Sequence, residues 1–160
     1  MRIALGSDHN GYFLKEELKK HVQDLGHDVI DYGCDSCEAV DYPDVAFRVA
    51  EDIVSKKVSR GILICGTGIG VAIAAGKVPG VRAALCHDTY SAERAQKSNN
   101  AQILTMGAQV IGVQLAKKVV DAYLKAQFSG GNSGRKVQKI INKENELLKG
   151  EANGYEETHQ

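Results

Sequence analysis

A cysteine followed by a glycine-rich loop is the part of this sequence best suited to chemistry. Residues 61–80 read GILICGTGIGVAIAAGKVPG, in which an apolar run ends at Cys65 and a glycine loop follows. This pattern predicts a buried parallel strand, a tight turn and a small-residue helix. Unpaired N–H groups at the start of a helix favour an anion. A thiol beside them could remove a proton and leave a stabilised oxyanion, which is the chemistry of an isomerase.

The glycine loop can be compared with two nucleotide-binding motifs. In the dinucleotide motif G-x-G-x-x-G the third glycine comes one residue later than Gly70 does here. Asp88 nevertheless lies near the place of a ribose-binding acid, so a nucleotide-binding module is one alternative. A P-loop does not fit, because no G-K-[ST] follows the glycines. A plain strand–helix turn without a function is the other alternative.

Length and charge narrow the possible partners. The 160 residues predict a single domain over 1–148, followed by a polar and mobile tail over 149–160. Twenty basic and 20 acidic residues give a net charge of zero, which does not favour nucleic acid as a partner. No apolar stretch reaches the ~20 residues of a membrane span, and no signal-peptide pattern precedes the first strand. We therefore expect a cytoplasmic protein without a membrane partner.

The four cysteines do not suggest a disulfide scaffold or a metal site. Cys34 and Cys37 form a C-x-x-C pair, but no second pair completes the four ligands of a structural zinc. The pair also lies in a polar turn, whereas a thioredoxin-type pair starts a helix directly after a strand. The residues themselves thus favour two loop cysteines without a function, and no metal.

Strand-like and helical patterns alternate along the chain. Strands are expected near 2–6, 28–32, 60–65, 81–86 and 102–106, with helical spacing of apolar residues between them. This alternation predicts an α/β fold, a Rossmann-like doubly wound sheet of five parallel strands with helices on both faces. A last helical pattern, over 137–148, has no following strand. It predicts a C-terminal helical arm whose apolar face packs on a partner subunit.

Polar residues follow the other predicted strands and could join Cys65 at one edge of the sheet. After the first strand stand Asp8 and His9, which could bind sugar hydroxyls or a phosphate. The remaining candidates are Asp41, Asp44, His87, Asp88, Ser98, Asn99 and Asn100. Each has a structural alternative, because Asp8, Asp41 and Asp88 could cap helices and the asparagines suit a turn.

Four segments together are highly specific: GSDHNG at 6–11, AVDYP at 39–43, ILICGTGIG at 62–70 and AAGKVPGVRAALCHD at 74–88. Through them, residues 1 to about 141 resemble the ribose-5-phosphate isomerase B family, which also contains the galactose-6-phosphate isomerase subunits. The resemblance implies a Rossmann-like fold and a small phosphorylated sugar as substrate. It also implies a homodimer or dimer of dimers with shared active sites, and no metal or other cofactor.

The resemblance also implies roles for individual residues. Cys65 is expected to carry a proton between C1 and C2 of the sugar, helped by the helix N-terminus, which favours a thiolate. Thr67 is expected to assist at a substrate oxygen, and the backbone amides of the loop to hold the enediolate oxygen. These amides belong to Gly66, Gly68, Ile69 and Gly70 and their neighbour Thr67. The further implied substrate-binding residues are Asp8, His9 on the phosphate side, Tyr42 at the pocket wall, and Asn99 from the neighbouring subunit.

The chain departs from the family pattern at the substrate pocket. Ser98 stands where ribose-specific members have a ring-opening histidine. Gln109 and Asn132 stand where they have phosphate-side arginines, and a third arginine falls at Lys136 unless Arg135 takes its place by a one-residue slip. Arginine clamps a phosphate with two hydrogen bonds in a way that glutamine and asparagine cannot.

The residues and the resemblance together leave three candidate functions. The first is an aldose–ketose isomerase acting through a cis-enediolate, with ribose 5-phosphate as the family's default substrate. The second is the same chemistry on a tetrose phosphate, erythrose 4-phosphate or erythrulose 4-phosphate. A tetrose phosphorylated on O4 cannot close a five-membered ring, so it needs no ring-opening histidine. The third, a binding module without turnover, is disfavoured because binding alone does not need a thiol base.

Overall fold

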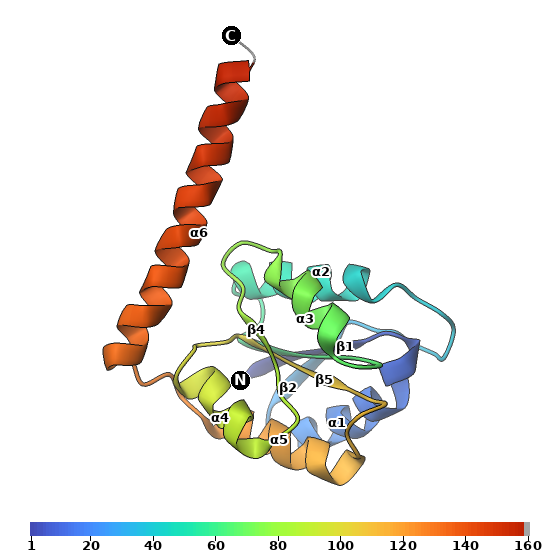
Figure 1. Cartoon of the computed structure of the whole chain (residues 1–160). Coiled ribbons are helices and arrows are strands. Elements are labelled where there is room, and N and C mark those ends of the chain that lie inside the picture. The colour runs from blue at the N-terminus through green and yellow to red at the C-terminus, as the bar shows by residue number, and fades with distance from the viewer. Residues whose placement is uncertain (159–160) are drawn as a thin grey trace.

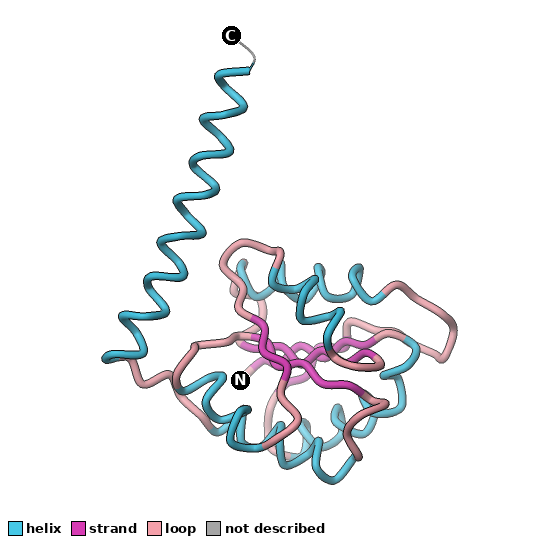
Figure 2. The backbone as a smooth tube through the Cα atoms, viewed as in Figure 1, coloured by secondary structure: helices cyan, strands magenta, loops and turns pink. Residues whose placement is uncertain are grey.

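The computed structural model describes residues 1–158 as a parallel five-stranded sheet between two layers of helices (Figures 1 and 2). The strands are β1 Arg2–Ser7, β2 Asp28–Asp31, β3 Arg60–Cys65, β4 Ala83–Leu85 and β5 Ile103–Gly107. Their order in the sheet is β2-β1-β3-β5-β4, and every neighbouring pair is parallel. The α/β class and the five parallel strands predicted from the sequence are confirmed.

The helices cover both faces of the sheet, as Figure 1 shows. One face carries α1 Tyr12–Asp24, α4 Thr89–Lys97 and α5 Val113–Lys125, and the other carries α2 Tyr42–Val54 and α3 Ile69–Gly76. A short 3₁₀-helix, η1 His9–Gly11, joins β1 to α1. The fold is therefore doubly wound, with one hydrophobic core on each side of the sheet.

The central strand β3 is buried along its whole length. Successive side chains of a strand point to opposite faces, so Ile62 and Ile64 enter the core under α1, α4 and α5. Leu63 and Cys65 enter the core under α2 and α3. The alternation along β3 thus directs the Cys65 thiol toward the layer that contains α3, the helix that starts just after the glycine loop.

The strand order favours a ligand-binding site at the carboxyl ends of β1 and β3. These strands are neighbours in the sheet, and the chain leaves them toward opposite sides, since β2 lies beyond β1 while β5 and β4 lie beyond β3. Open parallel sheets bind ligands in the crevice that such a reversal of strand order creates. Ser7 and Ile64 are paired in register at this edge, which places Asp8 close to Cys65.

A buried ion pair fixes the chain where it passes the end of β1. The Lys15 side chain is fully buried and contacts both carboxylate oxygens of Asp31 at 2.8 Å. Burial by itself would raise the pKa of Asp31, but the hydrogen bonds from Lys15, Gly33 and Lys19 hold it below its usual 3.8. Gly33 in turn accepts from Ser7 N–H at 2.7 Å. This network holds the segment after β2 against the residues that lead to Asp8.

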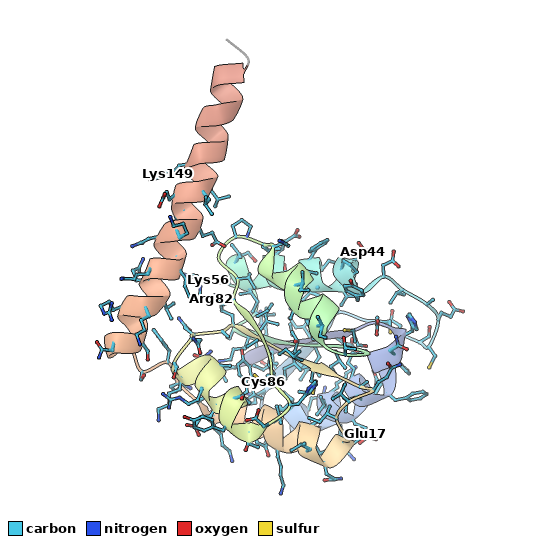
Figure 3. The ribbon with its side chains drawn as sticks, in the orientation of Figure 1. Glu17, Asp44, Lys56, Arg82, Cys86 and Lys149 are labelled. Carbon is cyan, nitrogen blue, oxygen red and sulfur yellow. The ribbon has the colours of Figure 1, made fainter. Side chains whose placement is uncertain are left out.

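The predicted C-terminal arm is a helix, α6 Gly131–Thr158. It leaves the body beside α4 and extends past the edge of the sheet, with Lys149 on its projecting part (Figures 1 and 3). Val137 is buried and Glu144 accepts a hydrogen bond from Gly80 N–H, whereas Ile140 and Leu147 are exposed. The mobility expected for 149–160 stays a prediction, and residues 159–160 lie outside the described residues. Through residue 158, every helix is too short or too polar to cross a bilayer.

Candidate active site

A cavity of about 460 Å³ lies at the carboxyl edge of the sheet, where the glycine loop meets the start of η1 and α2. Its lining residues are Asp8, Asn10, Tyr42, Cys65, Gly66, Thr67, Ile69, Gly70, Ile73 and Gln109. Eight of these ten belong to the site residues expected from the sequence, all except Asn10 and Ile73. The structure therefore brings the glycine loop, the first strand end and the start of α2 together around one thiol.

The thiol of Cys65 is held by its own loop. Gly68 adopts a left-handed conformation with φ +79°, which turns the chain so that Gly68 N–H donates to Cys65 Sγ at 3.1 Å. The cysteine is buried, with 4% of its surface exposed, and α3 begins at Ile69. The N–H donor on the sulfur and the nearby helix N-terminus both direct positive partial charge toward Cys65. This arrangement orients the sulfur at the lining of the cavity.

Thr67 is oriented by a hydrogen bond within the loop. Its Oγ1 accepts from Ile69 N–H at 3.2 Å. Because that bond uses an oxygen lone pair, the hydroxyl proton of Thr67 stays available for a ligand oxygen. The loop thus holds a proton acceptor, Cys65, and a proton donor two residues apart.

Tyr42 forms a wall of the cavity against the glycine loop. It is the first residue of α2, which has proline next to it in the first turn. A Cβ atom on Gly70 would lie 2.5 Å from Tyr42 Cζ, so only glycine lets the tyrosine ring come this close. The expected place of Tyr42 at the pocket wall agrees with this geometry.

Asp8 has a structural role and also lines the cavity. Its Oδ1 accepts from the N–H groups of Asn10 and Gly11 at 3.0 and 3.2 Å, which caps η1. His9 is not among the lining residues, and its Nδ1 accepts from Val40 N–H at 3.3 Å. Asp8 therefore caps η1, as the alternative interpretation expected, and it also lines the cavity.

Two lining residues were not among the expected site residues. Asn10 stands in the GSDHNG segment, two residues after Asp8, so its position in that segment was an available signal. Ile73 follows Ile69 by one turn of α3, and both are exposed, at 60% and 51%. Exposed apolar residues on a short helix beside a cavity are the signal that could have found Ile73.

The remaining expected residues form a second group, far from Cys65. Ser98 ends α4, and Asn99 stands just before β5, at the amino edge of the sheet. Cys65 is paired with Gly107 at the opposite end of β5, so the length of this strand, roughly 15 Å at ~3.3 Å per residue, separates the two groups. Three exposed residues in the first turns of α6 complete the second group. They are Asn132, Arg135 and Lys136.

The second group borders a hollow of its own. Asn99 lines a cavity of about 420 Å³ together with Arg82, Arg94 and Ile140. Ser129 joins the start of α6 to α4, since its N–H and hydroxyl both donate to Lys97 O. Within one copy of the chain, these residues cannot reach the Cys65 cavity.

Asp88 and the C-x-x-C pair, for which the sequence left other functions open, have structural positions. Asp88 accepts from Ser91 N–H at 2.7 Å and caps α4. Cys34 is buried, with its Sγ 3.8 Å from Ser7 Oγ, and Cys37 is exposed. Among the described residues, no three acidic, histidine or cysteine side chains gather as metal ligands would. The C-x-x-C pair therefore belongs to the loop that packs beside β1.

Comparison with known proteins identifies the family. The model of the ribose/galactose isomerase family matches residues 3–140. The chain belongs to this family. D-erythrulose-4-phosphate isomerase of Pectobacterium atrosepticum is 52% identical over 141 residues, which cover 88% of this chain and 93% of that protein. Ribose-5-phosphate isomerase B of Escherichia coli is 45% identical over 139 residues, or 87% of this chain and 93% of its own.

A solved structure shares the fold. Clostridium thermocellum ribose-5-phosphate isomerase B superposes with a TM-score of 0.90 at 47% identity, covering 92% of this chain and 99% of its own. The family, the Rossmann-like fold and the isomerase class predicted from the sequence are thus confirmed.

The close contact between β5 and the glycine loop generates a test of the site. A Cβ atom on Gly107 would lie 2.5 Å from Thr67 C and 2.6 Å from Thr67 Cα. We expect Gly107→Ala to displace Thr67 and to lower the isomerase kcat about 100-fold, as small misplacements of reacting groups do. Gly112→Ala is the matched control, because its Cβ would meet nothing within 4 Å. Steady-state kinetics of both variants check this, and equal kcat values would contradict it.

Proposed function

We propose that this protein is an aldose–ketose isomerase of a small sugar phosphate that uses Cys65 as its base and has ribose 5-phosphate as its substrate. The observation that carries the proposal is the Cys65 thiol in a cavity, with Gly68 N–H on its sulfur and Thr67 beside it. Buried thiols that only fill space do not need a hydrogen-bond donor or an open cavity. The family membership adds the class of substrate.

The proposed reaction moves one hydrogen from C2 to C1 of the open-chain sugar. Cys65 thiolate takes the proton from C2, and the electron pair leaves a cis-enediolate with its charge on O1. The Thr67 hydroxyl gives its proton to O1 and takes the proton of the O2 hydroxyl in return, so the negative charge moves from O1 to O2. The Cys65 thiol then returns its proton to C1, and the carbonyl forms at C2. Loop amides stabilise the enediolate, and no external oxidant or reductant is required.

The base can be tested by substitution. We expect Cys65→Ala to lower kcat by about 100-fold or more with KM changed little, because a positioned general base is typically worth ~10²–10⁴. Cys86→Ala is the control for loss of a buried thiol. Burial raises the pKa of Cys86 to about 11, so that thiol stays protonated at neutral pH. Near-normal turnover by Cys65→Ala would remove the proposed base.

A tetrose phosphate is the second candidate substrate, and two features of this chain favour it. Ser98 replaces the ring-opening histidine that the family resemblance implies, and an O4-phosphorylated tetrose has no five-membered ring to open. Gln109, which lines the cavity, is a neutral amide where an arginine clamp is implied. The Pectobacterium relative with 52% identity carries the name of a tetrose-phosphate isomerase.

The ratio of kcat/KM for erythrulose 4-phosphate and ribose 5-phosphate separates the two substrates. If the chain acts on the pentose through the default mechanism, that ratio is below one. If Ser98 marks an open-chain substrate, the ratio exceeds one. In that case Ser98→His raises kcat for ribose 5-phosphate by about tenfold or more and leaves the tetrose unaffected. A wild type that prefers ribose 5-phosphate and gains nothing from Ser98→His would show that another residue opens the ring.

We also propose that the active form is at least a dimer in which Asn99 completes the partner's site. The separation of the two residue groups supports this, because only a second copy can bring Asn99 to a Cys65 cavity. Exposed apolar residues support it too, since Ile69 and Ile73 border the cavity and Ile140 lies on α6. Free cysteines throughout the chain fit a reducing compartment, so we place the enzyme in the cytoplasm.

Complementation tests the shared site. Cys65→Ala and Asn99→Ala should each be nearly inactive alone. After joint unfolding and refolding in equal amounts, about half of the dimers are mixed, and each mixed dimer carries one intact site. About a quarter of the wild-type activity should then return. A mixture that stays as inactive as its parts, while a native-mass dimer is present, would contradict sharing of the site.

A further inference from the structure

The backbone of the glycine loop is held from the side of β5. Ala108 N–H donates to Cys65 O at 2.9 Å and Gln109 N–H donates to Gly66 O at 3.0 Å. Thr105 Oγ1 donates to Gly68 O at 2.8 Å. The position of the segment 105–109 therefore decides where the loop carbonyls, and with them the thiol and Thr67, are placed.

Gly107 lies in the middle of this segment and is itself held by a histidine. Its N–H donates to His87 Nε2 at 2.9 Å, while its Cα side is pressed against Thr67. A backbone N–H can only donate, so Nε2 must be the unprotonated nitrogen of His87 and the ring proton must sit on Nδ1. The contact thus exists only with a neutral imidazole.

His87 is placed for this contact by the end of β4. Cys86, the residue before it, is labelled in Figure 3 between the sheet and α4, and Cys86 N–H donates to Thr105 O at 3.1 Å. Asp88, the residue after it, caps α4 through Ser91 N–H. The chain is therefore held on both sides of His87, whose half-buried ring accepts from Gly107 N–H.

We propose that His87 is a positioning residue for the isomerase reaction: its neutral ring holds Gly107, and through it the Cys65–Gly68 loop, in the productive position. This inference rests on the proposed function of that loop. When the ring takes up a second proton, Nε2 becomes a donor that faces the donor of Gly107. The hydrogen bond is then lost and the amide is left without its partner, which displaces the segment against Thr67.

The surroundings of His87 contain few charges that could mask this effect. Cys86 and Asp88 flank it on its own segment, and Tyr90 lies in the first turn of α4. Across from it, Cys65 ends β3, while residues 66–76 and 107–116 contain no titratable side chain. Cys65 and the substrate are the same in every variant, so a comparison between variants at each pH removes their contribution.

His87→Gln provides the decisive variant. A glutamine amide oxygen can accept from Gly107 N–H near the place of Nε2 but does not titrate. We expect the ratio of kcat for His87→Gln to kcat for the wild type to rise about fivefold as pH falls from about 8 to about 5.5, the range in which imidazoles change charge. His87→Ala should lower kcat about tenfold at the upper pH with KM nearly unchanged, because it removes the acceptor altogether.

A matched control and a second readout accompany the kinetics. His21→Gln replaces another half-buried histidine, which lies in the last turn of α1 and contacts Asp121 of α5 at 2.7 Å. The ratio of kcat for His21→Gln to kcat for the wild type should not change with pH. Backbone amide NMR of the wild type should show the Gly107 signal titrating together with the His87 ring. In His87→Gln that signal should not titrate in this range.

The outcomes are distinguishable from those that concern the proposed function. The positioning role is overturned if the kcat ratio of His87→Gln to wild type does not change with pH. It is also overturned if the Gly107 amide signal does not change when the His87 ring takes up a proton, even if Cys65 is the base. The NMR readout needs no turnover, so it decides the matter even if His87→Gln folds poorly. An active Cys65→Ala would instead overturn the proposed base and leave the Gly107 titration intact.

Discussion

The pairing of β3 with β5 is the constraint on which the catalytic end of this molecule depends. Its last paired residues are Cys65 and Gly107, one at the start of the glycine loop and the other in contact with Thr67. Close-packed contacts of this kind transmit a displacement, because little free space between β5 and the loop can absorb it. The glycine at the end of β5 is thus as much a part of the site as the glycines of the loop itself.

The loop also shows how a small set of hydrogen bonds can prepare a site before substrate arrives. The loop carbonyls accept hydrogen bonds from β5 and the residues after it, while Gly68 N–H donates to the sulfur of Cys65. The loop is therefore preorganised, so little reorganisation is needed when charge develops on a substrate oxygen. Figure 1 shows the loop between the end of β3 and α3, at the edge of the sheet opposite the start of α6.

The distribution of expected substrate residues over two edges of the sheet links recognition to assembly. In the proposed dimer, the base and the loop come from one copy, while the residues around Asn99 and the start of α6 come from the other. Substitutions such as Ser98 and Asn132 could then change the substrate without disturbing the Cys65 loop in the same chain. Activity in such an arrangement depends on protein concentration below the dissociation constant of the dimer.

Much of this architecture could be predicted from local patterns. All five strands lie within two residues of their expected positions, because buried parallel strands read as short apolar runs between turn signals. The strand predicted over 81–86 is shorter in the structure, Ala83–Leu85, since the N–H of Arg82 bonds to the side chain of Gln102 rather than to a strand. Cys65 could be predicted as a site residue from the local sequence too, because the thiol, the glycines and the start of the helix are adjacent in the chain.

Other features of the site required the tertiary structure. The resemblance implied His9 on the phosphate side and Asn99 from the neighbouring subunit. Only the assembled chain shows that His9 accepts from Val40 N–H and that Asn99 lies at the opposite edge of the sheet from Cys65. The link from His87 to Gly107 also emerges only when the strands are assembled. The sequence by itself determined the strands, the helices, the family and the thiol with its loop, because neighbours along the chain encode these. The order of the strands decided which segments meet, since the alternation of side chains states which face is buried but not which strand lies beside it.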